Sequence, residues 1–435
     1  MFSKILIANR GEIAVRIIRA CREMGIATVA VYSTADADAL HVAIADESYC
    51  IGGNEPSDSY LNEDRIISAA ILAGAQAIHP GYGFLSENAS FASKCEKNGI
   101  VFIGPSSETM QRLSDKVKLK EQMQQAGLTV IPGSGEVSDL RKAIRKADEL
   151  GYPVMLKASN GGGGRGIRLV RSRKEMTEIY PQAKAEAKAA FGEGRLYLEK
   201  YIYPARHVEF QILADEQGHV VCLGERDCSL QRRHQKLMEE TPSPAVTADM
   251  RQNMIQLLLP AIQRIGYTGV GPVEFLLDRE GIFYLMEMNL RLQVEHPVTE
   301  MLTGIDLVKW QIRTAAGIPL RFSQEDILME GTSVECRINA AGCGRIGLLH
   351  VPGGPQVRFD TWLLQGSVVS PYYDALLGKL VVKAANREKA LRKMRSALSE
   401  LAIEGISTNI EEQMNLISDD RIVSGEYDLS YMGNR

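Results

Sequence analysis

The first hundred residues alternate between short apolar runs, typical of strands, and stretches whose apolar side chains recur at helical spacing. Strand-like runs occupy residues 5–8, 28–32, 75–79 and 100–103, and helix-like stretches occupy residues 13–21 and 66–72. Strands that alternate with helices predict a parallel sheet of the doubly wound kind. This pattern is the strongest constraint that the sequence places on the fold.

The pattern changes near residue 114. Helix-like residues 116–126 and 140–150 are followed by strands at 154–159 and 167–170 and by a β-rich stretch at 195–224. Strand pairs joined by turns predict an antiparallel sheet here. From about residue 331 an alternating strand leads to a final helix rich in Lys, Arg and Ala. We therefore expect three domains, at residues 1–113, 114–331 and 332–435.

Composition and charge exclude several classes of protein. The chain has 50 Lys plus Arg against 54 Asp plus Glu, a net charge of −4, and is 45% apolar. Such a balance favours a globular protein that does not bind nucleic acid. No apolar run approaches the ~18 residues of a membrane span, and the N-terminal apolar run is shorter than the ~7–15 residues of a secretory signal. The seven scattered cysteines lack metal-ligand spacing, so we expect reduced thiols in a cytoplasmic enzyme.

A glycine-rich string, NGGGGRG at residues 160–166, stands between two predicted strands. It contains GxGxxG, but a dinucleotide fingerprint requires a helix to follow, and the Lys-Ser/Thr of a P-loop is missing. The string instead predicts a hairpin whose backbone N–H groups close over phosphates, with Lys157 beside it to neutralise charge. A mobile surface turn is the alternative.

Two β-type runs, residues 272–278 and 282–289, carry one glutamate each. If residue 277 lies opposite residue 282, Glu274 faces Leu285 and is diagonal to Glu287, at ~7–8 Å. Close carboxylates repel one another without a cation, so the pair predicts Mg²⁺ or Mn²⁺ bridging to phosphate oxygens. Two exposed acids on a solvated face would give the same pattern.

Polar and apolar residues continue to alternate beyond this hairpin. Glu287, Asn289, Arg291, Gln293 and Glu295 occupy the odd positions, and the even positions are apolar. If the chain stays extended, these groups line one face. A guanidinium forks onto a small oxyanion such as bicarbonate, and a carboxylate beyond it can take a proton. An amphipathic surface strand is the alternative, although it would normally use Thr, Ser and Lys.

A basic cluster, ERDCSLQRRHQKLMEE at residues 225–240, is either a solvated face or a source of anion-binding cations. His207 and Glu209 alternate in the string RHVEFQ and carry little weight alone.

Together these strings resemble those of the biotin carboxylases, ATP-grasp enzymes of biotin-dependent carboxylation. The strings are KILIANRGEIAVRIIRAC, HPGYGFLSEN, FIGP, KASNGGGGRGIRLV, YLEKYI, RHVEFQILAD, ERDCSLQRRHQK, MEMNLRLQVEHPVTE and VECRINA. The resemblance runs from residue 3 to the last helix. It implies an α/β and α+β fold, in which an ATP-grasp domain follows an N-terminal doubly wound parallel-sheet domain and precedes a C-terminal biotin carboxylase domain.

The resemblance also implies site residues. Two lysines would bind phosphates, the glycine string would form a flap over ATP, and residues 199–202 would hold adenine. The implied ATP-binding residues are Lys116, Lys157, Gly162, Gly163, Gly164, Arg165, Gly166, Glu199, Lys200, Ile202, His207, Gln231, His234, Glu274, Leu276 and Glu287. The implied ligands of Mg²⁺ or Mn²⁺ are Glu274, Glu287 and Asn289, in agreement with the hairpin argument.

The implied chemistry joins bicarbonate to biotin at the expense of ATP, which makes the chain an ATP-dependent ligase. Bicarbonate would be bound by Arg291, Gln293, Val294 and Lys236. Glu295 would be the general base with Lys236 as its cationic partner, and Arg337 would stabilise the biotin enolate beside Tyr82. The catalytic residues implied are thus Glu295, Arg337, Lys236 and Arg291.

The resemblance implies partners as well. They are a biotin carboxyl carrier protein, whose biotin is the substrate, carboxyltransferase subunits and a second copy of the chain in a homodimer. The sequence contains no Met-Lys-Met biotinylation site, which predicts a stand-alone subunit of acetyl-CoA carboxylase or of a related acyl-CoA or pyruvate carboxylase. The chain departs from the family pattern after Asn339, where the segment AAGCGRIGLLHVPGG is short.

Three other functions remain compatible with parts of the pattern. Another ATP-grasp ligase, of the carbamoyl-phosphate type, would share the acidic hairpin and the glycine string. The short segment after Asn339 is compatible with a non-catalytic nucleotide-binding or assembly subunit. The alternation alone is also compatible with a structural protein that has a patterned surface.

Overall fold

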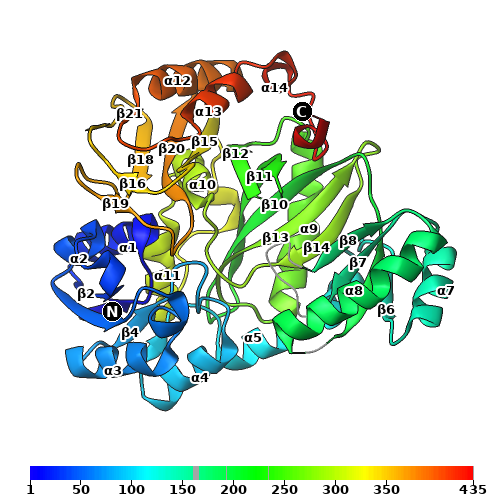
Figure 1. Ribbon diagram of the computed structural model, residues 1–435, viewed down its shortest axis with the longest axis horizontal. Helices are drawn as coiled ribbons and strands as arrows, with labels where there is room; N and C mark the ends of the chain where they lie inside the picture. Colours follow the sequence, from blue (N-terminus) through cyan, green and yellow to red (C-terminus); the bar gives the residue numbers. More distant parts are fainter. Residues whose placement is uncertain (160–165, 193, 234, 435) are drawn as a thin grey trace.

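The computed structural model describes residues 1–159, 166–192, 194–233 and 235–434 (Figure 1). The N-terminal part contains the predicted parallel sheet, with strand order β3-β2-β1-β4-β5. Its strands are β1 (Lys4–Ile7), β2 (Ala27–Ser33), β3 (Glu47–Gly52), β4 (Ala77–His79) and β5 (Val101–Phe102). Strand β3 was not predicted, because this edge strand alternates half-buried and exposed residues and has no apolar run.

Helices connect these strands and cover the sheet. They are α1 (Gly11–Glu23), α2 (Leu40–Ile44), α3 (Glu63–Ala73), α4 (Ala89–Lys97) and α5 (Ser107–Ser114), with short 3-10 turns at Thr34–Asp36 and Pro56–Asp58. The apolar side of α1, which includes Ile13, Ile17 and Ile18, packs on Ile5 and Ile7 of β1. The doubly wound arrangement predicted from the alternation is confirmed in this part of the chain.

A small lobe lies at the edge of the molecule opposite the N-terminal sheet (Figure 1). After α6 (Lys116–Gln125), its sheet has the order β6-β9-β7-β8. The strands are β6 (Gly133–Glu136), β7 (Val154–Ala158), β8 (Ile167–Val170) and β9 (Leu196–Lys200), covered by α7 (Leu140–Leu150) and α8 (Arg173–Phe191). Asp139 caps α7 by accepting a hydrogen bond from the N–H of Lys142 at 2.9 Å, and Ala143 and Ala147 bury one face of the helix.

The largest sheet is antiparallel, as predicted, and has the order β14-β13-β10-β11-β12-β15-β20-β18. Its strands are β10 (Ala205–Ala214), β11 (Val220–Arg232), β12 (Gln235–Thr241), β13 (Gly269–Asp278), β14 (Phe283–Met288), β15 (Thr332–Asn339), β18 (Val357–Thr361) and β20 (Leu376–Ala384). Because β12 pairs with β15, one sheet continues from the middle of the chain into its C-terminal part.

The two faces of this sheet differ in polarity. On β10, Val208, Phe210 and Ile212 pack in the core with Leu258 of α9 (Ala248–Arg264). The intervening residues of β10 are polar and point to the opposite face, since side chains alternate along a strand. The opposite face therefore carries buried polar side chains in the centre of the molecule.

The C-terminal part surrounds β15 and β20. Its other elements are α12 (Arg387–Glu400), α13 (Ile410–Leu416), α14 (Asp420–Ser424), the 3-10 turn Met432–Asn434, and the short strands β16 (Gly344–Arg345), β17 (Leu349–His350), β19 (Val368–Val369) and β21 (Ala402–Ile403). A further 3-10 turn, Gln324–Asp326, precedes β15 and contacts β11. The short segment after Asn339 forms β16 and β17, which pair with β19 and β21. It leaves β15 paired with β12 and β20 on its two edges.

Two further helices, α10 (His296–Thr303) and α11 (Leu307–Ala315), follow β14 in the chain. Helix α10 contacts β15 and β20, and α11 contacts β13 and α1. Among the described residues, no helix combines the length and apolar character needed to cross a bilayer.

Candidate active site

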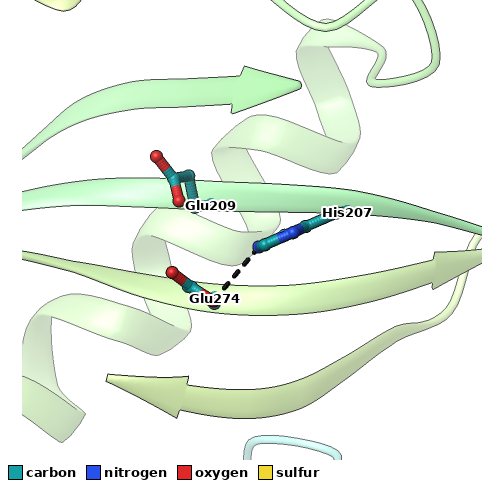
Figure 2. Close-up of side chains that lie close together, drawn as sticks. All are labelled: His207, Glu209 and Glu274. Atoms are coloured by element: carbon teal, nitrogen blue, oxygen red, sulfur yellow. Dashed lines mark ion pairs between the residues drawn. The ribbon is translucent and has the colours of Figure 1, made fainter. Parts of the chain in front are cut away.

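Neighbouring strands place acidic and basic side chains together on the polar face of the large sheet. Glu209 of β10 lies directly opposite Glu274 of β13, and His207 precedes Glu209 by two residues on the same face. Figure 2 shows His207 and Glu274 approaching one another from these two strands, with Nε2 and Oε2 3.2 Å apart. All three side chains are buried, so their charges must be balanced locally.

Cations from other strands provide that balance. Nζ of Lys236, on β12, lies 2.9 Å from Oε2 of Glu209 and 4.0 Å from Oε1 of Glu274. Burial raises the pKa of Glu274, but His207 and Lys236 outweigh it and hold the pKa at about 2. Burial lowers the pKa of His207, and the Glu274 carboxylate more than reverses this effect, so the pKa lies above 6.5.

The register of the β13–β14 hairpin differs from the prediction. Leu277 pairs with Phe283, and a bulge follows, so Glu274 lies directly opposite Glu287 and not opposite Leu285. The turn is one residue longer than the tight turn assumed, and the bulge adds a second residue to the offset. Glu274 and Glu287 are therefore nearer neighbours than the predicted diagonal would make them.

This pair fits a divalent cation. Glu274 and Glu287 are opposed carboxylates, Asn289 lies beside Glu274, with its Nδ2 2.6 Å from Oε1, and Lys116 forms an ion pair with Glu287. Oxygen donors of this kind suit Mg²⁺ or Mn²⁺, and like charges across two strands favour a bound cation.

Another group that could hold an ion consists of His207, Glu209 and Glu274, whose donor atoms lie within 4.8 Å of one another. In this group Glu209 already accepts a hydrogen bond from Nε of Arg226 at 2.6 Å and from Lys236. Glu274 belongs to both groups, so the choice lies between Glu209 and Glu287. Glu209 is buried against two cations, whereas Glu287 is half-buried and pairs with Lys116 among the described residues, so the Glu274–Glu287 pair is the better candidate.

The chain after β14 is not extended, which corrects the second geometric prediction. It bends at residues 290–291, turns at 294–295 and enters α10 at His296. Both odd-numbered and even-numbered residues are buried here, because the segment is packed on all sides and does not lie on a surface. The bends still bring Gln293 back to Glu274, with Nε2 donating to Oε1 at 3.1 Å.

Arg291 is oriented by a loop of the N-terminal part. Its Nε donates to Oε2 of Glu87 at 2.9 Å, and its Nη1 donates to Oε1 of Gln293 at 3.1 Å. Oε1 of Glu87 also accepts from the N–H of Leu290 at 3.0 Å, which ties this loop to the bend. The Arg291 side chain is 21% exposed, so part of the guanidinium remains accessible to a small anion.

Glu295 lies at the N-terminus of α10 between two cations. Lys236 forms an ion pair with Oε1, and Nη2 of Arg337 donates to Oε2 at 2.9 Å. Burial raises the pKa of Glu295, but Lys236, Arg337 and Arg226 together hold it well below 4.5. The carboxylate is therefore ionised and can accept a proton once a bound anion competes for these cations.

Arg337, in the middle of β15, is held from several sides. Its Nε donates to Oε1 of Glu239 at 2.7 Å, and its backbone carbonyl accepts from the side chains of Asn409 and Gln413 at 3.0 and 2.9 Å. Burial lowers the pKa of Arg337, but Glu239 and Glu295 raise it above its usual value. The guanidinium keeps its charge and a fixed orientation.

The residues predicted to bind ATP phosphates and adenine meet in the small lobe and its hinge. Nζ of Lys157, on β7, lies 2.5 Å from Oε2 of Glu199, and Lys120 of α6 forms an ion pair with the same carboxylate. Lys200 donates from Nζ to the carbonyl of Gly151 at 2.6 Å. Ile202 is half-buried just beyond β9.

Gln231 and Leu276 border the acidic cluster. Nε2 of Gln231 lies 2.8 Å from Nδ1 of His207, and Leu276 faces His207 across β13 and β10. Gly166 precedes β8 with a φ of +72°. The remaining predicted ATP contacts, Gly162, Gly163, Gly164, Arg165 and His234, lie outside the described residues.

Tyr82 and Val294 are joined through a buried lysine. The hydroxyl of Tyr82 donates to Glu12 of α1, and Oε1 of Glu12 lies 3.0 Å from Nζ of Lys379. The same Nζ donates to the carbonyl of Val294 at 2.8 Å. The tyrosine predicted to contact biotin and the peptide predicted to bind bicarbonate are thus linked through Glu12 and Lys379.

Several residues that complete the site had no role predicted from the sequence. Glu209 had a signal, its alternation with His207, and Glu87 stood inside a quoted string. Glu239 likewise stood inside the quoted string 225–240, but its contact with Arg337 depends on β12 pairing with β15. Lys120 had no signal, because its contact with Glu199 depends on α6 approaching β9.

Comparison with known proteins identifies the family of each part of the chain. Residues 115–323 match the family "Carbamoyl-phosphate synthase L chain, ATP binding domain". Residues 1–110 and 335–434 match the N-terminal and C-terminal domains of biotin carboxylase. The biotin carboxylase from Nostoc sp. is 52% identical over 440 residues, which are 99% of this chain and 98% of that protein. Biotin carboxylase 1 of Bacillus subtilis is 49% identical over 442 residues, with the same coverage.

Solved structures give the same result. A biotin carboxylase from Campylobacter jejuni, in complex with β-γ-ATP, superposes with a TM-score of 0.98 at 47% identity and covers 100% of this chain and 99% of its own. The biotin carboxylase domain dimer of 2-oxoglutarate carboxylase from Hydrogenobacter thermophilus, bound to MgADP, ADP and bicarbonate, has a TM-score of 0.97 at 50% identity and covers 100% and 98%.

The fold and the site define an ATP-grasp enzyme, an ATP-dependent ligase. The family model of the middle part takes its name from carbamoyl-phosphate synthase, the alternative left open by the sequence. Both flanking models and the full-length relatives decide between the two, and the chain belongs to the biotin carboxylase family. It carboxylates biotin with ATP and bicarbonate, with Mg²⁺ as cofactor.

Proposed function

We propose that both chemical steps of biotin carboxylation take place between the Glu274–Glu287 pair and Arg337, with Glu295 as the base. The observation that carries this proposal is the position of Glu295, ionised between Lys236 and Arg337 at the N-terminus of α10. A carboxylate at this point can exchange a cationic partner for an incoming anion.

In the first step Glu295 takes the proton of bicarbonate. Bicarbonate bound by Arg291, Gln293 and the N–H of Val294 draws Lys236 toward its own oxygens. As Lys236 shifts away, the pKa of Glu295 rises, because a cation that stabilised its charged form is shared with the substrate. The base thus becomes effective only when the substrate is present.

The resulting carbonate oxygen attacks the γ-phosphorus of ATP, the bond to ADP breaks, and carboxyphosphate forms. Lys116 and Lys157 exchange their partners Glu287 and Glu199 for phosphate oxygens, which lowers the repulsion between the two anions. When bound by Glu274, Glu287 and Asn289, Mg²⁺ or Mn²⁺ would neutralise charge on the phosphates.

In the second step carboxyphosphate separates into CO₂ and phosphate, and the phosphate takes the proton of the biotin ureido nitrogen. Arg337 stabilises the oxyanion that forms on biotin, and the ureido nitrogen then attacks CO₂. In this proposal the ring of Tyr82 borders the biotin, and its hydroxyl stays bound to Glu12.

The chain serves a biotin-dependent carboxylase, with a biotin carboxyl carrier protein and carboxyltransferase subunits as partners in the cytoplasm. A homodimer is supported by the biotin carboxylase dimer of Hydrogenobacter thermophilus. That relative acts in 2-oxoglutarate carboxylase, and another relative at 48% identity is the biotin carboxylase subunit of pyruvate carboxylase.

Transfer of labelled bicarbonate to free biotin tests this function. We expect acid-labile label in carboxybiotin when ATP, Mg²⁺ and biotin are all present, and none when EDTA replaces Mg²⁺. ATP cleavage that requires ammonia and leaves biotin unlabelled would contradict the proposal and support a ligase of the carbamoyl-phosphate type.

A further inference from the structure

Two buried glutamates lie behind Arg337 with fewer partners than two carboxylates need. Strands β12 and β15 pair so that Glu239 is directly opposite Glu335, and both residues are 0% exposed. Directly opposed side chains of antiparallel strands have Cβ atoms ~4.5–5.5 Å apart on one face of the sheet. The two carboxyl groups are therefore close neighbours in a region without solvent.

The hydrogen bonds of this pair are incomplete. Among the described residues, Oε1 and Oε2 of Glu335 and Oε2 of Glu239 have no hydrogen-bond partner. The fourth oxygen, Oε1 of Glu239, accepts from Nε of Arg337 at 2.7 Å. Buried carboxylate oxygens without donors are costly, so this arrangement needs a physical explanation.

The neighbouring cations are engaged elsewhere. Arg337 also donates to Glu295, and Lys379 on the adjacent strand donates to the Val294 carbonyl and pairs with Glu12. Other charged groups around the pair have partners of their own. Lys236 pairs with Glu209 and Glu295, Lys383 donates to the Leu302 carbonyl, Arg358 pairs with Glu300 and Asp360, Arg16 pairs with Glu300 and Asp306, His296 contacts the Gln293 carbonyl, and Tyr82 donates to Glu12. The thiol of Cys336, on β15, packs in the apolar core.

A proton satisfies the pair better than a second charge or a metal ion. A protonated carboxyl is both donor and acceptor, so one added hydrogen joins the two groups. The described His, Cys, Asp and Glu clusters that could hold a metal ion include neither glutamate. Burial, and then the charge of Glu239, raise the pKa of Glu335 well above 4.5, which agrees with this geometry.

We infer that Glu335 is a protonated positioning residue, which donates its O–H to Oε2 of Glu239 and thereby holds the Glu239 carboxylate against Arg337. With this proton in place, Arg337 faces the charges of Glu239 and Glu295 alone. Loss of the proton would add a third carboxylate, draw the guanidinium toward the sheet and weaken its field at the biotin oxyanion.

The inference rests on the proposed role of Arg337 at the biotin, so its test has one arm that does not depend on that role. Infrared spectra of the wild-type enzyme and of Glu335→Gln at neutral pH report the carboxylic-acid C=O stretch. We expect a band in the wild type that Glu335→Gln removes. Identical spectra would overturn the inference whatever Arg337 does.

The second arm is kinetic. Glu335→Gln keeps a neutral donor toward Glu239, and we expect biotin carboxylation within about threefold of wild type, because the hydrogen bond is preserved. Glu335→Met has similar length and no donor, and we expect a loss of about 10- to 100-fold in biotin carboxylation, typical of a lost hydrogen bond to a charged group. ATP cleavage without biotin should stay within about threefold in both variants, since the lysines proposed to bind phosphate, Lys116 and Lys157, pair with Glu287 and Glu199 and not with this donor.

Equal rates in Glu335→Gln and Glu335→Met, or an equal loss of ATP cleavage and biotin carboxylation, would overturn the positioning role. If Glu335→Met does not fold, the infrared comparison with Glu335→Gln decides alone. Labelling of biotin by the wild-type enzyme tests the proposed function separately, so the two can fail independently.

Discussion

At the scale of single residues, the site shows how one sheet face controls charge. Glu295 and Arg337 come from separate segments, and each is ionised because the other balances it in a buried space. Lys236 and Glu239 extend this pairing on either side. The charges are thus oriented before substrates arrive, which is the condition for electrostatic stabilisation of a transition state.

Arg337→Ala tests whether Arg337 acts mainly in the carboxylation of biotin and not in the cleavage of ATP. Removal of a preorganised oxyanion partner lowers biotin carboxylation by about 10²–10³-fold. We expect biotin-independent ATP cleavage to fall less than about tenfold, since Arg337 reaches that step only through Glu295. Arg337→Lys, which keeps the charge without the fork, should lie between wild type and Arg337→Ala. Equal losses in both reactions would argue against the role at biotin.

At the scale of elements, the N-terminus of α10 holds the turn that carries Val294 and Glu295. Two lysines of β20 contact the helix at opposite ends: Lys379 donates to the Val294 carbonyl at 2.8 Å, and Lys383 donates to the Leu302 carbonyl at 3.2 Å. They lie four residues apart on one face of a strand. Lys379 is therefore a positioning residue for the peptide proposed to bind bicarbonate.

Lys379→Met should raise the KM for bicarbonate by about tenfold, the effect of losing a hydrogen bond from a charged donor. We expect the KM for ATP to change by less than about twofold, since the partners of Lys379, Glu12 and the Val294 carbonyl, are not among the residues proposed to bind ATP. Lys383→Met is the matched control and should leave both constants near wild type. A parallel rise in both KM values, or the same rise in Lys383→Met, would show that the lysine acts on the fold and not on the turn.

Some helices and strands were predicted from the sequence with correct bounds, whereas strand register and long-range pairing were not. Helix α7, predicted at 140–150, and strand β8, predicted at 167–170, have those bounds, because a cap and a clear apolar period define them locally. The predicted register of β13 and β14 was wrong, because the bulge in this hairpin depends on packing that no local sequence pattern indicates. The pairing of β12 with β15 joins segments about a hundred residues apart, and no local pattern predicts it.

The residues of the candidate site also differ in how far a local sequence pattern could predict them. The alternation in residues 287–295 predicted one extended face, whereas the segment is bent, and it is the bends that bring Gln293 to Glu274. Glu87, Lys120 and Glu239 reach the site only through contacts between distant elements, so sequence patterns could not assign them. Their positions depend on the tertiary fold.

At the scale of the whole molecule, a buried ion network joins the N-terminal part, α10 and the C-terminal sheet. Glu300 of α10 accepts from Arg16 of α1 at 2.9 Å and from Arg358 of β18 at 2.8 Å, and Arg358 pairs with Asp360 at 2.6 Å. Figure 1 shows α10 between the N-terminal sheet and the strands of the C-terminal part. The network therefore fixes the helix that carries Glu295.

Glu300→Ala leaves two buried arginines without this partner and should destabilise the protein by about 3–5 kcal/mol at neutral pH. Burial raises the pKa of Glu300, but Arg16 and Arg358 hold it well below 4.5, and the pKa of Asp360 is lowered to about 2. A carboxyl group whose pKa is lower in the folded than in the unfolded state stabilises the fold at pH values above its unfolded-state pKa. This stabilisation is lost as the pH falls toward the folded-state pKa. The difference in the free energy of unfolding between the wild type and Glu300→Ala, measured by urea unfolding, should thus become smaller below pH 4.5, the ordinary pKa of Glu300. A difference in the free energy of unfolding that becomes larger in acid would contradict this assignment.

The most direct test of the proposed chemistry is bicarbonate-dependent ATP cleavage by Glu295→Gln. The amide keeps the shape of the side chain but cannot take a proton, so we expect cleavage to fall to background while ATP binding, measured by calorimetry, stays within about threefold of wild type. Near-normal turnover in this variant would contradict the assignment of Glu295 as the base that activates bicarbonate.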